Sequence, residues 1–264
     1  VRVFESSPLR RLRAGTWGCL AETPEARIRA GSCVLAVGPA SGAAGSPLRG
    51  RLTVTSSHIV LTEPVPDLLE EIDWTGGECI TDSRAMVHYM RTTPDGRIAF
   101  GWGGGRIAYG ARLGRRTELD GDVVGEVASH LRSFFPGLEG RRITQAWGGP
   151  IDVSPGHLPM VVPLGADPVY CVFGYTGNGV GPSLMMGRTA ASLALDRRDE
   201  QSRLALVDPA PRRVPTGLAS WLGGNAIRTG VVAKEAAEEQ GATAGPLSRG
   251  LAAIPERIGF HIGR

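Results

Sequence analysis

One stretch of the 264-residue sequence restricts the fold more than any other, and it runs from Pro168 to Leu195. It opens with an apolar run, Val169 to Phe173, whose β-branched and aromatic residues are typical of a buried strand. Glycines stand at positions 174, 177, 179 and 181 in the turn that follows. The spacing beyond the turn predicts a helix with Arg188 on one face and an apolar face made of Val180, Leu184, Gly187, Ala191 and Leu195.

A strand, a glycine turn and a helix in this order present bare backbone N–H groups and the positive end of a helix to an electron-rich ligand. Glycine is suited to such a turn because a Cβ would block close approach and would disfavour positive φ. The same pattern also fits a tight turn that binds nothing, so spacing alone leaves both interpretations open.

The turn reads Gly174-Tyr-Thr-Gly-Asn-Gly-Val-Gly-Pro182 and leads into a helix of small residues. This wording resembles the C-terminal flavin-contacting segment of the FAD-dependent glycine/D-amino-acid oxidase (DAO) family, and within it the amine-oxidising branch that includes γ-glutamylputrescine oxidoreductases. The resemblance implies a loop around the pyrimidine end of a flavin, with the helix N-terminus aimed at N1 and the C2 carbonyl. The residues whose amides are then expected to converge on the flavin are Gly174, Tyr175, Thr176, Gly177, Asn178, Gly179 and Val180.

Two earlier segments resemble other FAD-contacting parts of the same family. Cys33-Val-Leu-Ala-Val-Gly38 is similar to a strand that ends in an Ala-Thr-Gly turn, although Val37 stands where Thr is usual. That likeness implies backbone contacts to FAD from Ala36, Val37 and Gly38. Glu5-Ser-Ser-Pro-Leu9 resembles the segment whose backbone contacts adenine, which implies a contact from Leu9. For both segments the alternative is an ordinary β-strand that ends at a glycine and makes no contact with FAD.

The predicted fold class is α+β: a mixed antiparallel substrate-domain sheet with helices, plus the C-terminal strand and helix of an FAD-binding domain of the GR2 type. The expected domains are 1–38 (partial FAD-binding domain), 39–165 (substrate domain), 166–200 (closing strand and helix) and 201–264 (C-terminal helical extension). Alternating or apolar runs predict strands at 1–4, 9–12, 17–22, 33–38, 52–55, 58–62, 80–82, 86–91, 97–101 and 143–149. Helical spacing predicts helices at 122–135 and 231–239, and Pro94-Asp-Gly96 predicts a hairpin turn.

The Gly-x-Gly-x-x-Gly turn that the family uses for the FAD pyrophosphate has no counterpart in this sequence. Gly101-Trp-Gly-Gly-Gly-Arg106 is rich in glycine, but no helical pattern follows it. We expect the N-terminal βαβ unit that carries this turn to lie before Val1, so that the chain corresponds to the C-terminal part of a family member. Flavin affinity without that unit is expected to fall by several kcal/mol.

The resemblance implies oxidation of an amine or amino-acid substrate by hydride transfer to FAD. Amino-acid oxidases of the family clamp the substrate carboxylate with an arginine soon after Trp-x-Gly, whereas this chain has Pro150-Ile151 there. Asp152 is a candidate for attracting a substrate ammonium group, and a turn-forming role is its alternative. Tyr89 and Arg91 are further substrate-pocket candidates, with cross-strand packing as the alternative. No cysteine lies between 147 and 160, so we expect FAD to be bound non-covalently.

Composition excludes several other classes of protein. Hydrophobic residues make up 42% and charged residues 21%, as in ordinary soluble domains. The arginines are scattered among acids, which argues against nucleic-acid binding. There is no signal-like segment and no long apolar run, so we expect a cytoplasmic protein without membrane contact. The four cysteines form no metal-ligand pattern, and no Gly-x-Ser-x-Gly elbow marks a hydrolase. The alternative function is a flavin-free subunit or binding protein that retains the fold without activity.

Overall fold

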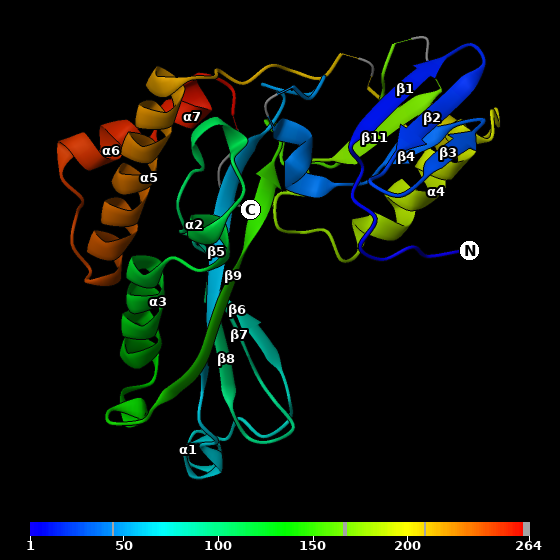
Figure 1. Cartoon of the computed structure of the whole chain (residues 1–264). Coiled ribbons are helices and arrows are strands. Elements are labelled where there is room, and N and C mark those ends of the chain that lie inside the picture. The colour runs from blue at the N-terminus through cyan, green and yellow to red at the C-terminus, as the bar shows by residue number, and fades with distance from the viewer. Residues whose placement is uncertain (44, 166–167, 209, 261–264) are drawn as a thin grey trace. The chain divides into compact units, whose positions relative to one another are not determined.

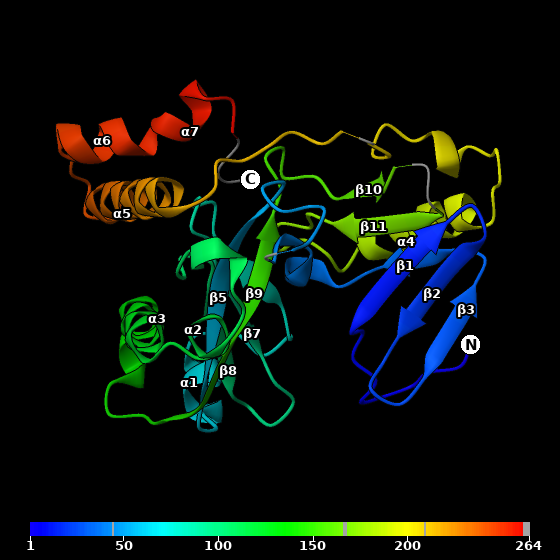
Figure 2. The ribbon, with the colours of Figure 1, turned by 45° about the horizontal axis from the view of Figure 1, so that its top comes forward.

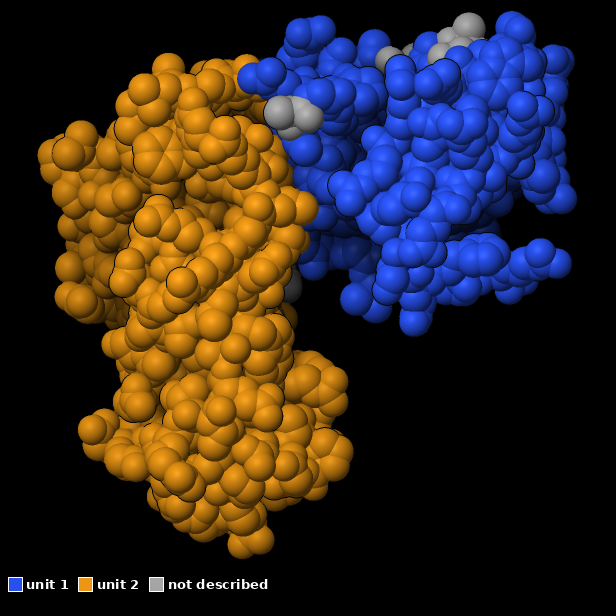
Figure 3. Space-filling view, viewed as in Figure 1, with its two compact units in different colours: residues 1–52, 152–213 blue, residues 53–151, 214–264 orange. Residues whose placement is uncertain are grey.

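The computed structural model describes residues 1–43, 45–165, 168–208 and 210–260. The chain forms two compact units, which Figure 3 shows in separate colours: unit 1 comprises residues 1–52 and 152–213, and unit 2 comprises residues 53–151 and 214–264. Segments 39–52 and 152–165, expected in the substrate domain, thus belong to unit 1. The expected C-terminal extension is divided between the units at residues 213 and 214.

Unit 1 contains two three-stranded sheets and a helix (Figure 1). The first sheet is an antiparallel meander of β1 (Arg11–Gly15), β2 (Gly18–Glu22) and β3 (Arg27–Ala30). The second has the order β10 (Met160–Pro163), β11 (Val169–Phe173), β4 (Cys33–Leu35). Strand β11 pairs antiparallel with β10 and parallel with β4, which joins the two distant segments of the chain that make up the unit.

Helix α4 (Pro182–Ala194) covers the second sheet of unit 1 with a face that the sequence pattern did not indicate. Met186 and Ala190 pack against Val161 and Val172 in the core. The predicted apolar face is exposed instead: Val180 is 97%, Leu184 65% and Leu195 61% accessible. The prediction of a helix is confirmed, but the choice of its buried face was wrong, because both faces of this helix carry apolar residues.

Unit 2 is built on a five-stranded sheet in the order β6-β7-β8-β5-β9. Its strands are β5 (Thr53–Thr62), β6 (Cys79–Thr81), β7 (His88–Thr92), β8 (Ile98–Trp102) and β9 (Ile143–Val153), whose last two residues belong to unit 1. The pairings β6–β7, β7–β8 and β5–β8 are antiparallel, which confirms the predicted sheet type. The turn before β8 is also confirmed, since Gly96 has a φ of +74° there and Thr93 and Arg97 pair across it.

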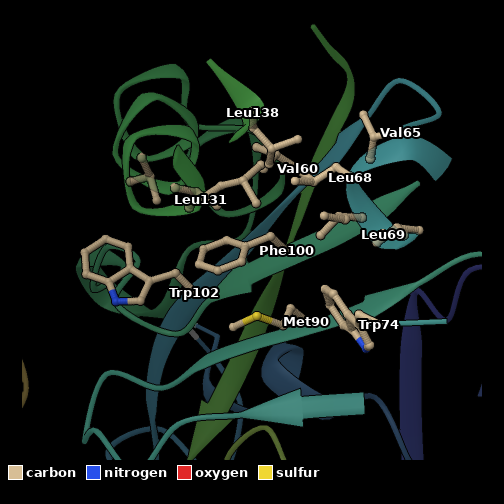
Figure 4. Close-up of a cluster of buried hydrophobic side chains, with 13 residues drawn as sticks. Val60, Val65, Leu68, Leu69, Trp74, Met90, Phe100, Trp102, Leu131 and Leu138 are labelled. Carbon is tan, nitrogen blue, oxygen red and sulfur yellow. The ribbon is translucent and has the colours of Figure 1, made fainter. Parts of the chain in front are cut away.

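Every second residue of β5 is buried, and these side chains face helix α3 (Gly121–Phe134). Figure 4 shows the resulting core, in which Phe100 and Trp102 of β8 lie beside Leu131 of α3. Asp120 caps α3 by accepting hydrogen bonds from the N–H groups of Asp122 and Val123. The shorter helices of unit 2 are α1 (Pro66–Glu71) and α2 (Arg115–Glu118).

The C-terminal helices α5 (Leu218–Glu239), α6 (Pro246–Ala252) and α7 (Ile254–Arg257) belong to unit 2, and Figure 2 shows α5 and α6 side by side. Three contacts fix α5. Trp221 Nε1 donates to the Ile107 carbonyl at 2.9 Å, Arg228 Nε donates to the Gly104 carbonyl at 2.7 Å, and Glu235 accepts from the Ala85 N–H at 2.6 Å. Among the helices of the described ranges, none is both long enough and apolar enough to cross a membrane.

Several predicted boundaries were wrong. Residues 1–4 form no strand and are exposed, and the strand predicted at 33–38 ends at Leu35. The helix predicted at 231–239 begins at Leu218, while β3, β10, α1, α2, α6 and α7 were not predicted at all. These segments are short, or they lack a clear period, so their conformation depends on neighbours that are distant in sequence.

A buried polar cluster lies between the sheet of unit 2 and its helices. His88 Nδ1 lies 2.7 Å from Asp82 Oδ2, and His88 Nε2 lies 2.9 Å from His130 Nδ1. Because the carboxylate only accepts, His88 donates from Nδ1 and accepts at Nε2. His130 is half-buried, whereas His58 is fully buried like His88. The Nε2 of His58 accepts from the Asp120 N–H at 3.1 Å, and its Nδ1 has no partner in the described ranges. Burial lowers the pKa of His58, His88 and His130 below 6.5.

These lowered pKa values predict that unit 2 becomes less stable as the pH falls. Below pH 6.5 the unfolded chain binds more protons than the folded chain at these three histidines, so the free energy of unfolding decreases on acidification, by at most about 1.4 kcal/mol per pH unit for each histidine. Burial raises the pKa of Glu235, whose contribution to the pH dependence has the opposite sign. Urea unfolding between about pH 7.5 and 5 measures the effect.

His130→Asn should give a shallower decline than the parent chain, because one of the three titrating groups is removed. A free energy of unfolding that stays constant over this pH range would contradict the placement of the histidines.

Candidate flavin site

The candidate site lies in the second sheet of unit 1, at the carboxyl ends of the two parallel strands β4 and β11. Cys171 of β11 pairs with Leu35 of β4, so Phe173 and Leu35 leave the sheet at the same edge. Two predicted FAD-contacting segments follow directly, namely residues 36–38 after β4 and residues 174–180 after β11. The carboxyl ends of parallel strands are where open α/β sheets bind their ligands.

The segment after β4 is exposed and short. Ala36 and Val37 lie outside the strand, and Val37 is 48% accessible. Gly38 has a φ of +51° and begins a 3₁₀ turn, Gly38–Gly42, that leads the chain away from the edge. Ser41 Oγ of this turn lies 3.5 Å from Cys171 Sγ, which keeps the turn against β11.

The segment after β11, residues Gly174–Val180, is here named the glycine loop, and it uses its backbone amides in two ways. The Gly174 N–H donates to Asp152 Oδ2 at 2.6 Å, and the Thr176 N–H donates to the Asp152 carbonyl at 3.0 Å. The Asn178 N–H donates to the Tyr175 carbonyl at 2.9 Å. These three amides are satisfied within the protein, which corrects the expectation that every amide of the loop points to a ligand.

The Tyr175 N–H also bonds to the Asp152 carboxylate. The remaining amides are those of Gly177, Gly179 and Val180, which have no hydrogen-bond partner in the part of the chain that the structure describes. The loop passes from buried at Gly174 to exposed at Gly177, so these donors lie on its outer half. Helix α4 starts directly behind them, with Gly181 at the N-cap, Pro182 in its first turn, no side-chain cap and no acidic residue. Free N–H groups and an uncapped positive helix end suit an electron-rich ligand such as the pyrimidine edge of a flavin.

Asp152 is 5% accessible and lies at the end of β9, within unit 1. Burial raises the pKa of its carboxyl group, and the backbone N–H groups of Gly174 and Tyr175 oppose that shift by stabilising the charged form. The carboxylate is buried and bonded to the glycine loop. Its placement therefore favours a role in fixing this loop, rather than the predicted role of attracting a substrate ammonium group.

Tyr89 and Arg91 lie in unit 2, on the face of strand β7 opposite to helix α3. The Tyr89 ring covers Gly101 of the paired strand, where a Cβ would lie 2.2 Å from ring atoms. Its hydroxyl is 2.7 Å from Ser57 Oγ, and burial raises its pKa. Tyr89 therefore makes the cross-strand contact that was its alternative role. Arg91 is exposed, and its Nε donates to the Thr92 carbonyl at 3.3 Å.

Leu9 is the last of the predicted site residues, and Ser154 and Ser57 are polar partners that were not predicted. Leu9 lies in the segment before β1 and is 45% accessible. Sequence reasoning missed Ser154, whose N–H donates to Thr176 Oγ1 at 3.3 Å, and Ser57. No local pattern marks either serine, since their partners are distant in sequence. In the described ranges, no group of three or more His, Cys, Asp or Glu residues is arranged to hold a metal ion.

Comparison with known proteins identifies what this chain is similar to. The family described as "DAO: FAD dependent oxidoreductase" matches residues 1–193. A probable oxidoreductase, OrdL, of Rhizobium meliloti is 34% identical over 128 residues, which is 47% of this chain and 27% of the relative. γ-Glutamylputrescine oxidoreductase of Escherichia coli is 27% identical over 193 residues, which is 73% of this chain and 43% of the relative.

The crystal structure of glycine oxidase from Geobacillus kaustophilus superimposes with a TM-score of 0.59 at 16% identity. The superposition covers 81% of this chain and 53% of the glycine oxidase chain, and it shows a shared fold. The chain thus spans less than half the length of the two curated relatives and about half of the solved one.

The geometry of the glycine loop predicts that Gly174→Ala destabilises unit 1. Gly174 has a φ of +87°, and a Cβ there would lie 2.9 Å from Ser154 Cβ. We expect a loss of about 1–3 kcal/mol from backbone strain and crowding. Gly187→Ala in helix α4 is the matched control, because a Cβ at Gly187 has no atom within 4 Å, and helix propensity gains up to about 1 kcal/mol.

Urea unfolding followed by circular dichroism compares the two variants with the parent chain. Equal stability of the Gly174→Ala and Gly187→Ala variants would contradict the loop geometry.

Proposed function

Because this chain belongs to the DAO family of FAD-dependent oxidoreductases, we propose that it forms the flavin-ring and substrate portions of an enzyme that oxidises a CH–NH type amine or amino acid. The observation that carries the proposal is that the amides of Gly177, Gly179 and Val180, in front of helix α4, have no partner among residues 1–43, 45–165, 168–208 and 210–260. When bound, FAD supplies the acceptor for a hydride from the carbon that bears the amine. The names of the relatives, γ-glutamylputrescine oxidoreductase and glycine oxidase, support this class of substrate.

The chain's own residues hold the flavin non-covalently in this proposal. The amides of Gly177, Gly179 and Val180 donate to the electron-rich edge of the ring, and the α4 N-terminus stabilises negative charge there. Ala36 and Val37, which are exposed, and the half-buried Gly38 follow the carboxyl end of β4 beside the glycine loop and are proposed as a second contact. Leu9 is proposed to contact the adenine end. On unit 2, Tyr89 and Arg91 are proposed to bind the substrate, with Arg91 attracting a carboxylate.

We further propose that a βαβ segment with the pyrophosphate-binding turn completes unit 1. Strand β4 is the edge of its sheet, so its outer side is available to a further strand. Next to the sheet, α4 exposes Leu184, Gly187 and Ala191, and the residues that flank the helix, Val180 and Leu195, are exposed as well. Small residues on such a face allow a second helix to approach closely. A flavin-free subunit that keeps this fold is the competing function, and flavin binding distinguishes the two.

FAD titration of the purified chain tests the proposal. We expect saturable binding that changes the visible flavin spectrum, with lumiflavin competing more strongly than ADP, because most of the proposed contacts are made to the ring and only Leu9 is proposed to contact the adenine end. Gly179→Ala should weaken binding roughly tenfold, since its methyl group would stand beside the free amides while meeting only the Tyr175 ring at 3.4 Å. Gly31→Ala in unit 1, where a Cβ would meet no atom within 4 Å, should bind like the parent chain. An absence of flavin binding, also after a βαβ segment is supplied, would favour the flavin-free subunit.

The substrate assignment predicts that Arg91→Ala raises KM roughly tenfold for amines that carry a carboxylate and leaves KM for other amines nearly unchanged. Anaerobic bleaching of the bound flavin by each amine gives the measurement. Arg142→Ala is the control, because Arg142 is an exposed arginine of unit 2 that pairs with Glu63 at 2.9 Å. An equal rise of KM in both variants would indicate a general effect of charge and would contradict a role for Arg91.

A further inference from the structure

The glycine loop is held in an unfavourable backbone conformation. Gly174, Thr176 and Gly177 have φ values of +87°, +53° and +81°. Positive φ is readily adopted by glycine, but it is a true outlier for a β-branched residue such as Thr176. A residue in this conformation persists only where the surrounding structure determines it, and such residues concentrate at functional sites.

Bonds to the end of β9 hold Thr176 in place. Its N–H donates to the Asp152 carbonyl at 3.0 Å, and its Oγ1 accepts from the Ser154 N–H at 3.3 Å and donates to the Gly174 carbonyl at 3.1 Å. The Asp152 carboxylate adds the strongest contact, since Oδ2 accepts from the Gly174 N–H at 2.6 Å. Hydrogen bonds to a charged acceptor are stronger than neutral ones.

Asp152 is buried together with the Gly174 N–H that it accepts from, so the carboxylate depends on this hydrogen bond in place of water. The residue is 5% accessible, and burying a carboxylate is costly unless hydrogen bonds compensate for the lost water. Its partners are the backbone N–H groups of Gly174 and Tyr175 at the start of the glycine loop. Asp152 thus binds the N–H groups of the inner half of the loop, whereas the amides of Gly177, Gly179 and Val180 in the outer half have no partner among the described residues.

We propose that Asp152 is a positioning residue for the flavin: its buried carboxylate fixes the inner half of the glycine loop, and thereby keeps the amides of Gly177, Gly179 and Val180 available to the ring. This inference rests on the proposed function and assigns to Asp152 no contact with the substrate. Replacement by Asn keeps an acceptor for Gly174 but removes the charge, whereas replacement by Ala leaves two N–H groups unsatisfied.

The experiment compares Asp152→Ala, Asp152→Asn and the control Asp199→Ala with the full parent chain. Asp199 is also a carboxylate of unit 1, but it accepts from Ser192 Oγ at 2.7 Å and from the Ser202 N–H at 3.0 Å, away from the glycine loop in sequence. The probe is FAD, and the readouts are its dissociation constant, its visible spectrum when bound, and hydrogen exchange of the Gly174 and Thr176 amides without flavin.

We expect Asp152→Ala to weaken FAD binding roughly tenfold or more, to alter the bound spectrum and to speed exchange of the two amides by a similar factor. Asp152→Asn should recover part of the affinity, and Asp199→Ala should change neither affinity nor spectrum. If Asp152→Ala fails to fold, Asp152→Asn serves as the test, and it should bind FAD more weakly than the parent chain and exchange the two amides faster.

Two failures are distinguishable. FAD binding by both Asp152 variants with the affinity and spectrum of the parent would overturn the positioning role and leave the proposed function standing. A parent chain that binds no FAD, also with a βαβ segment supplied, would overturn the proposed function and this inference with it.

Discussion

The parallel pairing of β11 with β4 is the constraint on which the candidate site depends. Parallel neighbours cannot be joined by a tight turn, so the chain must bring two distant segments together to form this pair. The register of Cys171 with Leu35 then sends both segments out of the sheet at one edge. Without this pairing, residues 36–38 and the glycine loop would have no reason to lie near one another.

The glycine loop divides its donors according to burial. A buried N–H needs a partner, and the buried Gly174 finds one in the equally buried Asp152. An exposed N–H can be satisfied by water until a ligand replaces it, and Gly177 and Val180 are exposed. The loop therefore combines an inner half whose donors are bonded within the protein with an outer half whose donors at Gly177 and Val180 are exposed, and support of this kind is what the proposed binding site requires.

The sequence predicted those helices and strands in which the spacing of apolar residues matches the face that is buried in the folded protein. Strand β11 and helix α3 were predicted within a residue of their bounds, because a short apolar run and a regular helical period each mark one structure. The buried face of α4 was not predicted, since Leu184 and Met186 are both apolar and only packing against β10 and β11 selects Met186. For the candidate site, the flavin contacts of the loop residues stay a prediction, and the bond between Asp152 and Gly174 was not predicted.

The sequence by itself determined the strand, glycine turn and helix, the alternation of β5 and the resemblance to a flavoprotein family, because these follow from neighbouring residues and their spacing. Only the tertiary structure decided that the Asp152 carboxylate bonds to Gly174, that α4 buries Met186, and that α5 is fixed to unit 2 through Arg228 and Glu235. The physical reason is that a buried polar group takes whichever partner the packed chain brings within hydrogen-bond distance, and that partner lies far along the sequence.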